Sequence, residues 1–450
     1  MRMSTRATMF VLLMSAIATP FLRAEESPSP VPVAAQMLSL QKARELTLLK
    51  SASLRKAELA VDAASLVKKA QDYDFLPSLS ASVGGSSDYG SGMTLAESLS
   101  ATANVEASAT VFDGGKNAAL SKKYSLATDA ARESLRATRV SLIGSADSAF
   151  FAVLEAEASV DAAASDLDAA KLRLKIAQTK VDAGSLSKAD YLQTESETAS
   201  YETTLISAKK SLSSARAKLC YLTGLPASTE PERIDFAGYD GLLGKLEALD
   251  ESGIDKLVAS LVAMAKANSP SLSNYALASG QAAMSLEAAK SAYFPSVSAG
   301  LSQSLTLNPS GLGPTSSLSL SASLSLDLWT TKNAVDQAQI AVKEAALDAE
   351  DGSSTLELDM SQAVYEWLSS ARAIPSSAKA LEYAESNYEN VLEKFKLSSA
   401  TASDLSTAEA LVSADKTALI AARYAFLSDL SSLRGLLGLE DEDKFLEALP

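Results

Sequence analysis

The stretch TSSLSLSASLSLDLW, which runs from Thr315 to Trp329, decides the fold. Six apolar residues alternate in it with five serines and one aspartate. This period of two is that of a β-strand with one apolar face and one small polar face. The rest of the chain is rich in alanine, leucine, lysine and glutamate, which favour helices. The sequence therefore predicts a mainly helical protein that carries strands with two different faces.

Two architectures explain such a strand. In a soluble protein its apolar face packs on a helix, whereas in a transmembrane β-barrel that face meets lipid and the polar face lines a wet lumen. Residues 318–328 would rise roughly 25 Å at the tilt of a barrel, which is the height of the apolar band of an outer-membrane barrel. The length favours the barrel. The residues expected to face lipid are Leu318, Leu320, Leu324 and Leu326.

The composition excludes several classes of protein. A net charge of −15 argues against nucleic acid as a partner, because binding to phosphates needs a basic surface. The chain has no histidine, the commonest general base, and its single cysteine, Cys220, allows neither an intrachain disulfide nor a zinc site. The sequence thus predicts no enzyme activity, no metal and no cofactor.

The N-terminus has the pattern of a secretory signal peptide. Arg2 and Arg6 precede a short apolar run at 9–18. We expect residues 1–24 to be the signal peptide, cleaved after about residue 18 or 24, and residues 25–37 to be a proline-rich segment. No later run of 18 apolar residues is present, so the sequence predicts no transmembrane helix.

An internal repeat divides the rest of the chain. Four pairs of similar motifs recur in the same order at nearly constant separation, which indicates a duplicated half-molecule. The separation is much longer than the repeat of a solenoid protein. The aligned residues, with their separations, are Pro77 and Pro295 (218), Lys116 and Lys332 (216), Asp190 and Asp404 (214), and Gly224 and Gly438 (214). We expect the repeats at 38–225 and 257–439, a connecting segment at 226–256 and a tail at 440–450.

Each repeat has the same order of elements. A helix leads into two strands, a long helix follows, and a second helix returns after a short interruption. The strands are expected at about 78–84, 98–112, 296–307 and 316–329. The first long helix, Lys116 to Asp182, would span about 100 Å. Such alanine-rich helices suit either a solid stalk or a thin-walled tube, and the proline at 375 is expected to kink the second long helix.

The motifs FLPSLSAS, YFPSVSAG, VFDGGKNAA, KVDAGSLSKADYLQTE and YLTGLP together resemble those of the TolC-like outer-membrane efflux proteins, over Leu38 to Leu439. The resemblance implies a homotrimer whose protomers each give four strands to one 12-stranded barrel in the lipid bilayer and helices to a 12-helix tunnel. It also implies that the protein lies in the outer membrane of a Gram-negative-type bacterium, with a large portion in the periplasm.

By the same resemblance the protein is a passive exit duct of a tripartite efflux pump or a type I secretion system. It would dock a periplasmic adaptor (membrane fusion protein) and an inner-membrane pump of the RND, ABC or MFS type. The alternative is a trimeric coiled-coil structural or interaction protein of the envelope, such as a stalk or an adaptor-like protein.

The resemblance also places candidate sites at the two turns between helices. The residues expected to dock the adaptor are Ala183, Gly184, Ser185 and Leu186 in the first turn, and Leu397, Ser398, Ser399 and Ala400 in the second. Asp404 and Asp190 are candidates for acidic rings at a periplasmic gate. Both aspartates could instead cap the helices that follow them, and Gly184 could be a purely structural turn residue.

Overall fold

The computed structural model describes residues 37–87, 99–308, 311–324, 327–397 and 399–440. The chain divides into the units Met1–Met37 and Leu38–Pro450, and all the helices and strands belong to the second. The expected signal peptide, most of the proline-rich segment and all but the first residue of the expected tail lie outside the described residues.

The elements follow the predicted order in each half. In chain order they are α1 (Leu40–Lys50), α2 (Ala52–Tyr73), β1 (Ser78–Ser87), β2 (Leu99–Phe112), α4 (Lys116–Asp182), α5 (Lys188–Thr223), η1 (Phe236–Tyr239), α6 (Asp240–Glu247), α7 (Glu251–Asn268), α8 (Pro270–Lys290), η2 (Ser291–Tyr293), β3 (Ser296–Asn308), β4 (Gly311–Ser323), α9 (Leu328–Lys396) and α10 (Ala402–Leu436).

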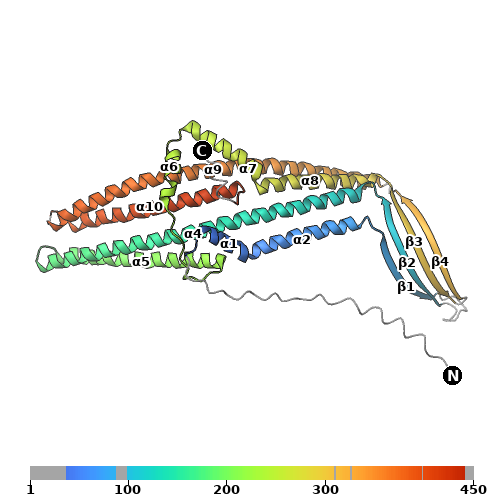
Figure 1. Ribbon diagram of the computed structural model, residues 1–450, viewed down its shortest axis with the longest axis horizontal. Helices are drawn as coiled ribbons and strands as arrows, with labels where there is room; N and C mark the ends of the chain where they lie inside the picture. Colours follow the sequence, from blue (N-terminus) through green and yellow to red (C-terminus); the bar gives the residue numbers. More distant parts are fainter. Residues whose placement is uncertain (1–36, 88–98, 309–310, 325–326, 398, 441–450) are drawn as a thin grey trace, which may run out of the picture. The chain divides into compact units, whose positions relative to one another are not determined.

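The four strands form one antiparallel sheet in the order β1-β2-β3-β4 (Figure 1). Its register sets one apolar row across all four strands: Leu79 lies opposite Ala107, which pairs with Leu301, which pairs with Leu318. On the other face serine hydroxyls pair across neighbouring strands. Their Oγ–Oγ distances are 2.9 Å for Ser78–Ser108, 2.8 Å for Ser296–Ser323, 2.9 Å for Ser298–Ser321 and 2.7 Å for Ser302–Ser317.

Neither face of the sheet packs on another element among the described residues. All of β4 is exposed, with 82% of Leu318 and 76% of Leu320 accessible. Among the described residues, no helix makes a substantial contact with β1 to β4. A soluble sheet would bury its apolar face on a helix, and no such packing is present among the described residues.

The fourth strand lies earlier than the expected range 316–329, because β4 ends at Ser323. Asp327 caps α9: its carboxylate accepts a hydrogen bond of 3.3 Å from a backbone N–H of the first helical turn. The alternation of leucine and serine continues past the strand, so periodicity alone does not reveal where the helix starts. Leu324 therefore follows the strand instead of belonging to it, and Leu326 lies outside the described residues.

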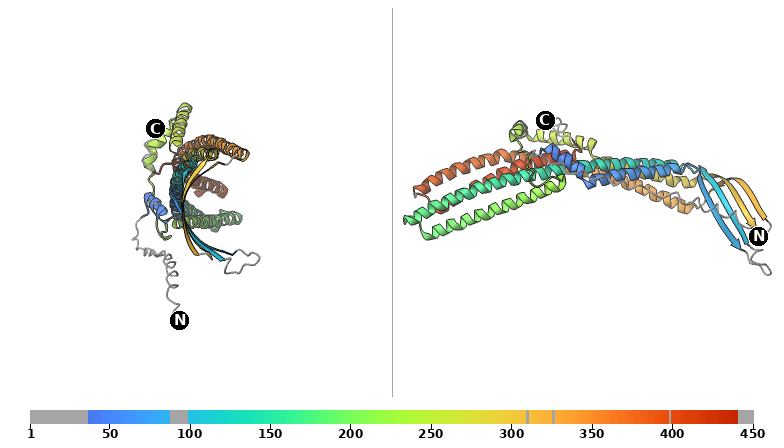
Figure 2. Two further views of the ribbon diagram at one scale, coloured as in Figure 1. Left: turned by 90° about the vertical axis from the view of Figure 1, so that its right-hand side faces the viewer. Right: turned by 60° about the horizontal axis from the view of Figure 1, so that its bottom comes forward.

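The helices are arranged side by side in two levels. Near the sheet their lateral order is α2, α4, α8, α9, and towards the far turns it is α5, α4, α10, α9 (Figures 1 and 2). Only α4 and α9, among the described helices, extend through both levels. We call α4 with α5 the first hairpin and α9 with α10 the second hairpin.

Two serines break helices that the sequence predicts as continuous. Ser51 separates α1 from α2 and accepts a hydrogen bond of 3.1 Å from the backbone N–H of Leu54. Ser269 separates α7 from α8 in the same way, and Pro270 follows it as the first residue of α8. A proline at this position has no N–H to leave unpaired, so it favours a helix start.

The main core lies where the two levels meet. There α1, α6 and α7 pack against α4, α9 and α10, and the rings of Trp367 and Phe426 stack with centroids 6.1 Å apart. Burial of each such large side chain contributes about 1.5–3 kcal/mol. The connecting segment expected at 226–256 contains η1, α6 and the start of α7.

Both long helices depart from simple expectations. α9 remains helical through Pro375, although proline removes one backbone hydrogen bond. Among the described residues, α4 has the predicted bounds, but it is also long and apolar enough to cross a membrane, which the sequence did not predict. Half of its apolar window is buried inside the structure, as in the core helix of a helical bundle.

Candidate functional site

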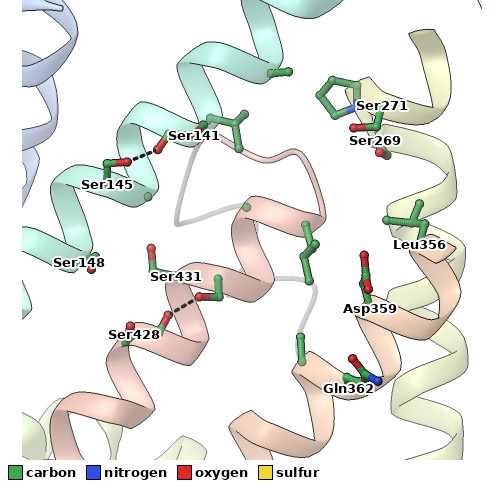
Figure 3. Close-up of a pocket in the computed structure, with 18 of the residues that line it drawn as sticks. Ser141, Ser145, Ser148, Ser269, Ser271, Leu356, Asp359, Gln362, Ser428 and Ser431 are labelled. Carbon is green, nitrogen blue, oxygen red and sulfur yellow. Dashed lines mark hydrogen bonds between the residues drawn. The ribbon is translucent and has the colours of Figure 1, made fainter. Parts of the chain in front are cut away.

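A cavity of about 1230 Å³ lies where α10 ends and α8 begins (Figure 3). Its walls come from α4, α8, α9 and α10, with a contribution from the end of α5. We call it the serine groove. Its serine and glycine lining residues are Ser141, Gly144, Ser145, Ser148, Ser269, Ser271, Gly352, Ser428, Ser431, Ser432 and Gly435.

The helices turn opposite faces towards the groove and towards the core. On α10, Ser428 and Ser432 line the groove, whereas Phe426 and Leu430 are buried in the core. Spacings of three and four residues place each set on its own side of a helix. α4 and α9 follow the same pattern. The sequence thus builds a wall that is apolar on one side and small and polar on the other.

The groove has little capacity for covalent chemistry. The hydroxyl of Ser145 donates to the carbonyl of Ser141 at 2.9 Å, and that of Ser432 to the carbonyl of Ser428 at 3.0 Å (Figure 3). These bonds satisfy the hydroxyls within their own helices. Activation of a serine needs an adjacent base, most often histidine, and the chain has none. The hydroxyls of Ser145 and Ser432 are therefore small polar groups that are already hydrogen-bonded within their helices.

The charge of the groove is negative. Asp351, Asp359 and Glu366 lie on α9 at spacings of eight and seven residues, which places them on one face of that helix. Lys218 is the one basic residue among the described lining residues. A concave surface with a surplus of carboxylates attracts cations and repels anions.

A fully buried carboxylate, Asp147, joins three helices beside the groove. Nε and Nη2 of Arg44 on α1 lie 2.6 and 3.1 Å from its two oxygens. The hydroxyl of Ser431 on α10 donates to it at 2.6 Å, and the guanidinium of Arg434 donates as well. A buried charge is tolerated when it is paired and hydrogen-bonded in this way. We call Asp147 with these partners the upper cluster.

The structure places both gate candidates at helix starts. Ser187 caps α5 and Thr401 caps α10, and each hydroxyl accepts a hydrogen bond of 3.1 Å from the backbone N–H of Asp190 or Asp404. The carboxylate of Asp404 also accepts from the backbone N–H of Thr401 at 2.9 Å, which completes a capping box. This bond and the Thr401 hydroxyl hold the pKa of the exposed Asp404 below its ordinary value.

The two turns share a backbone pattern. In the first turn Gly184 has φ of +70°, and nothing lies within 4 Å of where its Cβ would be. The backbone N–H of Ser185 donates to the carbonyl of Lys180, and that of Ser399 donates to the carbonyl of Lys394, both at 2.8 Å. Such bonds close a helix end. Ser398 lies outside the described residues.

The predicted sites lie at opposite ends of the helices, with the serine groove between them. The leucines expected to face lipid are on the sheet, and the docking and gate candidates are at the far turns (Figure 1). A contact joins the turns: the amino group of Lys180 donates to the carbonyl of Phe395 and lies 4.0 Å from the centre of its ring. The sequence alone predicts neither the groove nor the upper cluster, because both depend on contacts between the two halves.

Comparison with known proteins places this geometry in a family. The sequence profile of the outer membrane efflux proteins matches residues 43–225 and 261–439. No curated protein sequence matches the chain significantly.

Solved structures with the same fold cover nearly all of the chain. CusC has a TM-score of 0.79 at 17% identity, over 89% of this chain and 92% of its own. VceC from Vibrio cholerae has a TM-score of 0.76 at 15% identity, over 89% and 96%. The open state of MtrE from Neisseria gonorrhoeae has a TM-score of 0.71 at 21% identity, over 89% of each chain.

Proposed function

The chain belongs to the outer membrane efflux protein family, and on that premise we propose that it is the passive exit duct of a tripartite efflux pump or a type I secretion system. Its strands cross the outer membrane, and its helices form a tunnel through the periplasm. Cargo moves through the tunnel without chemical change, and energy comes from an inner-membrane pump of the RND, ABC or MFS type.

The sheet is the observation that carries the proposal. It has an apolar face and a hydroxyl-lined face, and both are exposed in the chain. Its outer strands β1 and β4 each have one edge without a partner strand among the described residues. Lipid does not tolerate unpaired backbone N–H and C=O groups, and four strands are too few to close a barrel. Further copies of the same chain supply the missing partners, and three copies give twelve strands.

Exposed apolar residues on the outer helices support the same assembly. Leu59 and Leu66 on α2 are 65% and 62% exposed, and Ile340 and Leu347 on α9 are 55% and 64% exposed. α2 and α9 are the two ends of the lateral order near the sheet. In a ring of protomers α9 of one copy therefore contacts α2 of the next, and these apolar side chains become buried in the interface.

The serine groove forms part of the tunnel wall in this assembly. Its small hydroxyls leave room for passing cargo, and its carboxylates favour cations. The far turns dock the periplasmic adaptor, with the exposed Leu397 as an apolar contact. Asp404 and Asp190 combine capping with a second role, in which three copies of each form acidic rings at the entrance.

A pair of arginine substitutions tests the membrane assignment. Leu320→Arg places a charge on the lipid-facing side of β4, and it is expected to destabilise the assembled protein by about 2–4 kcal/mol. Ser321→Arg is the matched control on the opposite face, and it is expected to assemble and to change the conductance. The measurements are the amount of heat-resistant trimer in the outer membrane and single-channel recording in planar bilayers. Equal loss of trimer in both variants contradicts the proposal, as does a stable, soluble monomer of the wild type.

A further inference from the structure

A second buried ionic cluster joins the two hairpins nearer to the far turns. Arg173 on α4 is 3% exposed. Its Nη1 lies 2.6 Å from Oε2 of Glu409 on α10, and its Nη2 lies 3.1 Å from Oε2 of Glu197 on α5. One guanidinium of the first hairpin therefore neutralises a carboxylate of the second. We call this the lower cluster.

Other ionisable groups face it from every helix packed around it. Asp166 on α4 is nearly buried, and its carboxylate lies 3.7 Å from the amino group of Lys416 on α10. Tyr201 on α5 and Tyr388 on α9 are half-buried beside Glu409 and Arg173. The pKa of Tyr201 is raised to about 12, first by burial and then by the charge of Glu409. Around Glu409 the carboxylates thus outnumber the cations.

The carboxylate of Glu409 is poorly satisfied in its ionised form. It lies at ion-pair distance from Arg173, but the angles are not those of a hydrogen bond, and neither oxygen has a hydrogen-bond donor among the described residues. Burial raises the pKa of Glu409 to about 7, and Asp166 and Glu197 act in the same direction against the attraction of Arg173. A proton on this carboxylate removes an unsolvated charge.

We propose that the lower cluster is a proton-operated latch, which holds the two hairpins together when Glu409 is protonated and loosens when it ionises. The inference goes beyond the proposed function and does not depend on transport. It rests on a buried acid at the contact between the two hairpins, Glu409 of α10 against Arg173 of α4.

The sign follows from the two environments of the acid. In water Glu409 has its ordinary pKa of 4.5, and in the closed arrangement it has a pKa of about 7. Between these values the closed arrangement binds the additional proton, so closure takes up a proton and opening releases one. The stabilisation by protonation is complete below the lower value and is lost as the pH rises through the upper one. The ratio of open to closed protomers rises by up to about tenfold per pH unit in this window.

Neighbouring contacts determine where the hairpins separate. The upper cluster ties α4 to α10 about 40 Å away, at 1.5 Å per residue along α4. Its acid is hydrogen-bonded by two guanidiniums and a hydroxyl. The second hairpin is therefore held at the upper level, and separation at the far turns also breaks the contact of Lys180 with the carbonyl and ring of Phe395.

A distance measurement across the far turns tests the latch. Nitroxide labels are attached at Ser185→Cys and Ser399→Cys in a Cys220→Ser background. When labelled protomers are diluted with unlabelled ones, the measured distance is the one between the two labels of a single protomer. Both label sites are exposed. The mature protein in detergent is expected to show a short distance at about pH 5.5 and a longer population at about pH 8, with a midpoint near neutrality.

Three variants assign the effect to Glu409. Glu409→Gln mimics the protonated acid and is expected to keep the short distance at both pH values. Glu197→Gln removes a charge that raises the pKa of Glu409, so its midpoint moves to lower pH. The matched control is Glu195→Gln. Glu195 aligns with Glu409 in the first repeat, but its side chain is exposed, so this variant is expected to behave like wild type.

Two results would overturn the latch. One is a wild-type distance that does not change with pH, and the other is a pH-dependent change that persists in Glu409→Gln. The readout is independent of conductance. A protein that forms no channel but responds in this way refutes the proposed duct and keeps the latch, whereas a conducting channel with an invariant distance does the reverse.

Discussion

The upper and lower clusters join the same two helices and have opposite charge stoichiometry. In the upper cluster one buried carboxylate, Asp147, meets two guanidiniums and a hydroxyl, which all donate hydrogen bonds to it. In the lower cluster one buried guanidinium, Arg173, meets the carboxylates of Glu197 and Glu409 without hydrogen-bond geometry to Glu409. Asp147 and Arg173 are 26 residues apart on α4, and Glu409 and Arg434 are 25 apart on α10. The nearly equal spacing is that of two contacts along one antiparallel pair of helices.

This difference shows that the ratio of acids to bases determines what a buried ion pair does. A surplus of donors around one acid gives the buried carboxylate of Asp147 hydrogen bonds to both of its oxygens, which makes a firm joint. A surplus of acids around one base leaves one acid poorly compensated, and its proton then responds to the surroundings. The same helix pair thus holds a fully hydrogen-bonded contact and one whose acid has a raised pKa.

Removal of the acid from the upper cluster is expected to have the largest effect. Asp147→Ala leaves the buried guanidinium of Arg434 and the partly buried one of Arg44 without their carboxylate, and it is expected to cost about 3–5 kcal/mol of unfolding free energy. The measurement is urea unfolding followed by circular dichroism. Asp161→Ala, which removes a 70% exposed acid from the same helix, is the control and is expected to change little. A loss below about 1 kcal/mol would remove the distinction between the clusters.

Removal of the base from the lower cluster comes next. Arg173→Met leaves Glu409, Glu197 and Asp166 together, and it is expected to cost about 2–4 kcal/mol near pH 8 and less at lower pH. The dependence on pH arises because Glu409, whose pKa is already raised, takes up a proton as the pH falls. Arg132→Met, at a 64% exposed position of α4, is the control. A loss that is equal at both pH values would mean that the lower cluster is as fixed as the upper one.

A cap substitution gives the smallest effect and marks the limit of the comparison. Thr401→Val removes the hydroxyl that caps α10 and is expected to cost about 1 kcal/mol. The lowered pKa of Asp404 means that its contribution is present above its ordinary pKa and is lost as the pH falls below that value. The loss is therefore expected to be the same across neutral pH, in urea unfolding at several pH values. A change in the neutral range would mean that the cap and the lower cluster are coupled.

The sequence predicted the local features of the fold well. The alternation of apolar and polar residues revealed all four strands. The ends of β1, β2 and β3 lie within three residues of their expected ranges. β4 was displaced because alternating leucines and serines continue into the approach to α9, where the Asp327 cap takes over. The breaks at Ser51 and Ser269 were missed, although Pro270 directly after Ser269 is a signal for a helix start.

The clusters were not predicted, because their partners lie in different repeats. A local signal was nevertheless present. Asp166 and Arg173 fall in the same helical phase as the buried Leu167, Ala170 and Ala177, where an apolar residue is expected. Charged residues in a core phase indicate a buried pair, but they do not identify the partner. The gate remains a prediction, because a single chain does not bring the copies of Asp404 together.

The pairing of β2 with β3 has a consequence for how the protein folds. Ala101 lies opposite Leu307, more than 200 residues later, whereas β1 with β2 and β3 with β4 are joined by short connections. Contacts between residues close in the chain form quickly, and those that close a long loop form late. The two strand pairs are therefore ready well before the sheet is complete. Until then each pair keeps an apolar face and unpaired edges, the features that make β-structure prone to aggregation. The pair of β1 and β2 therefore has to be protected from other chains until β3 and β4 join it.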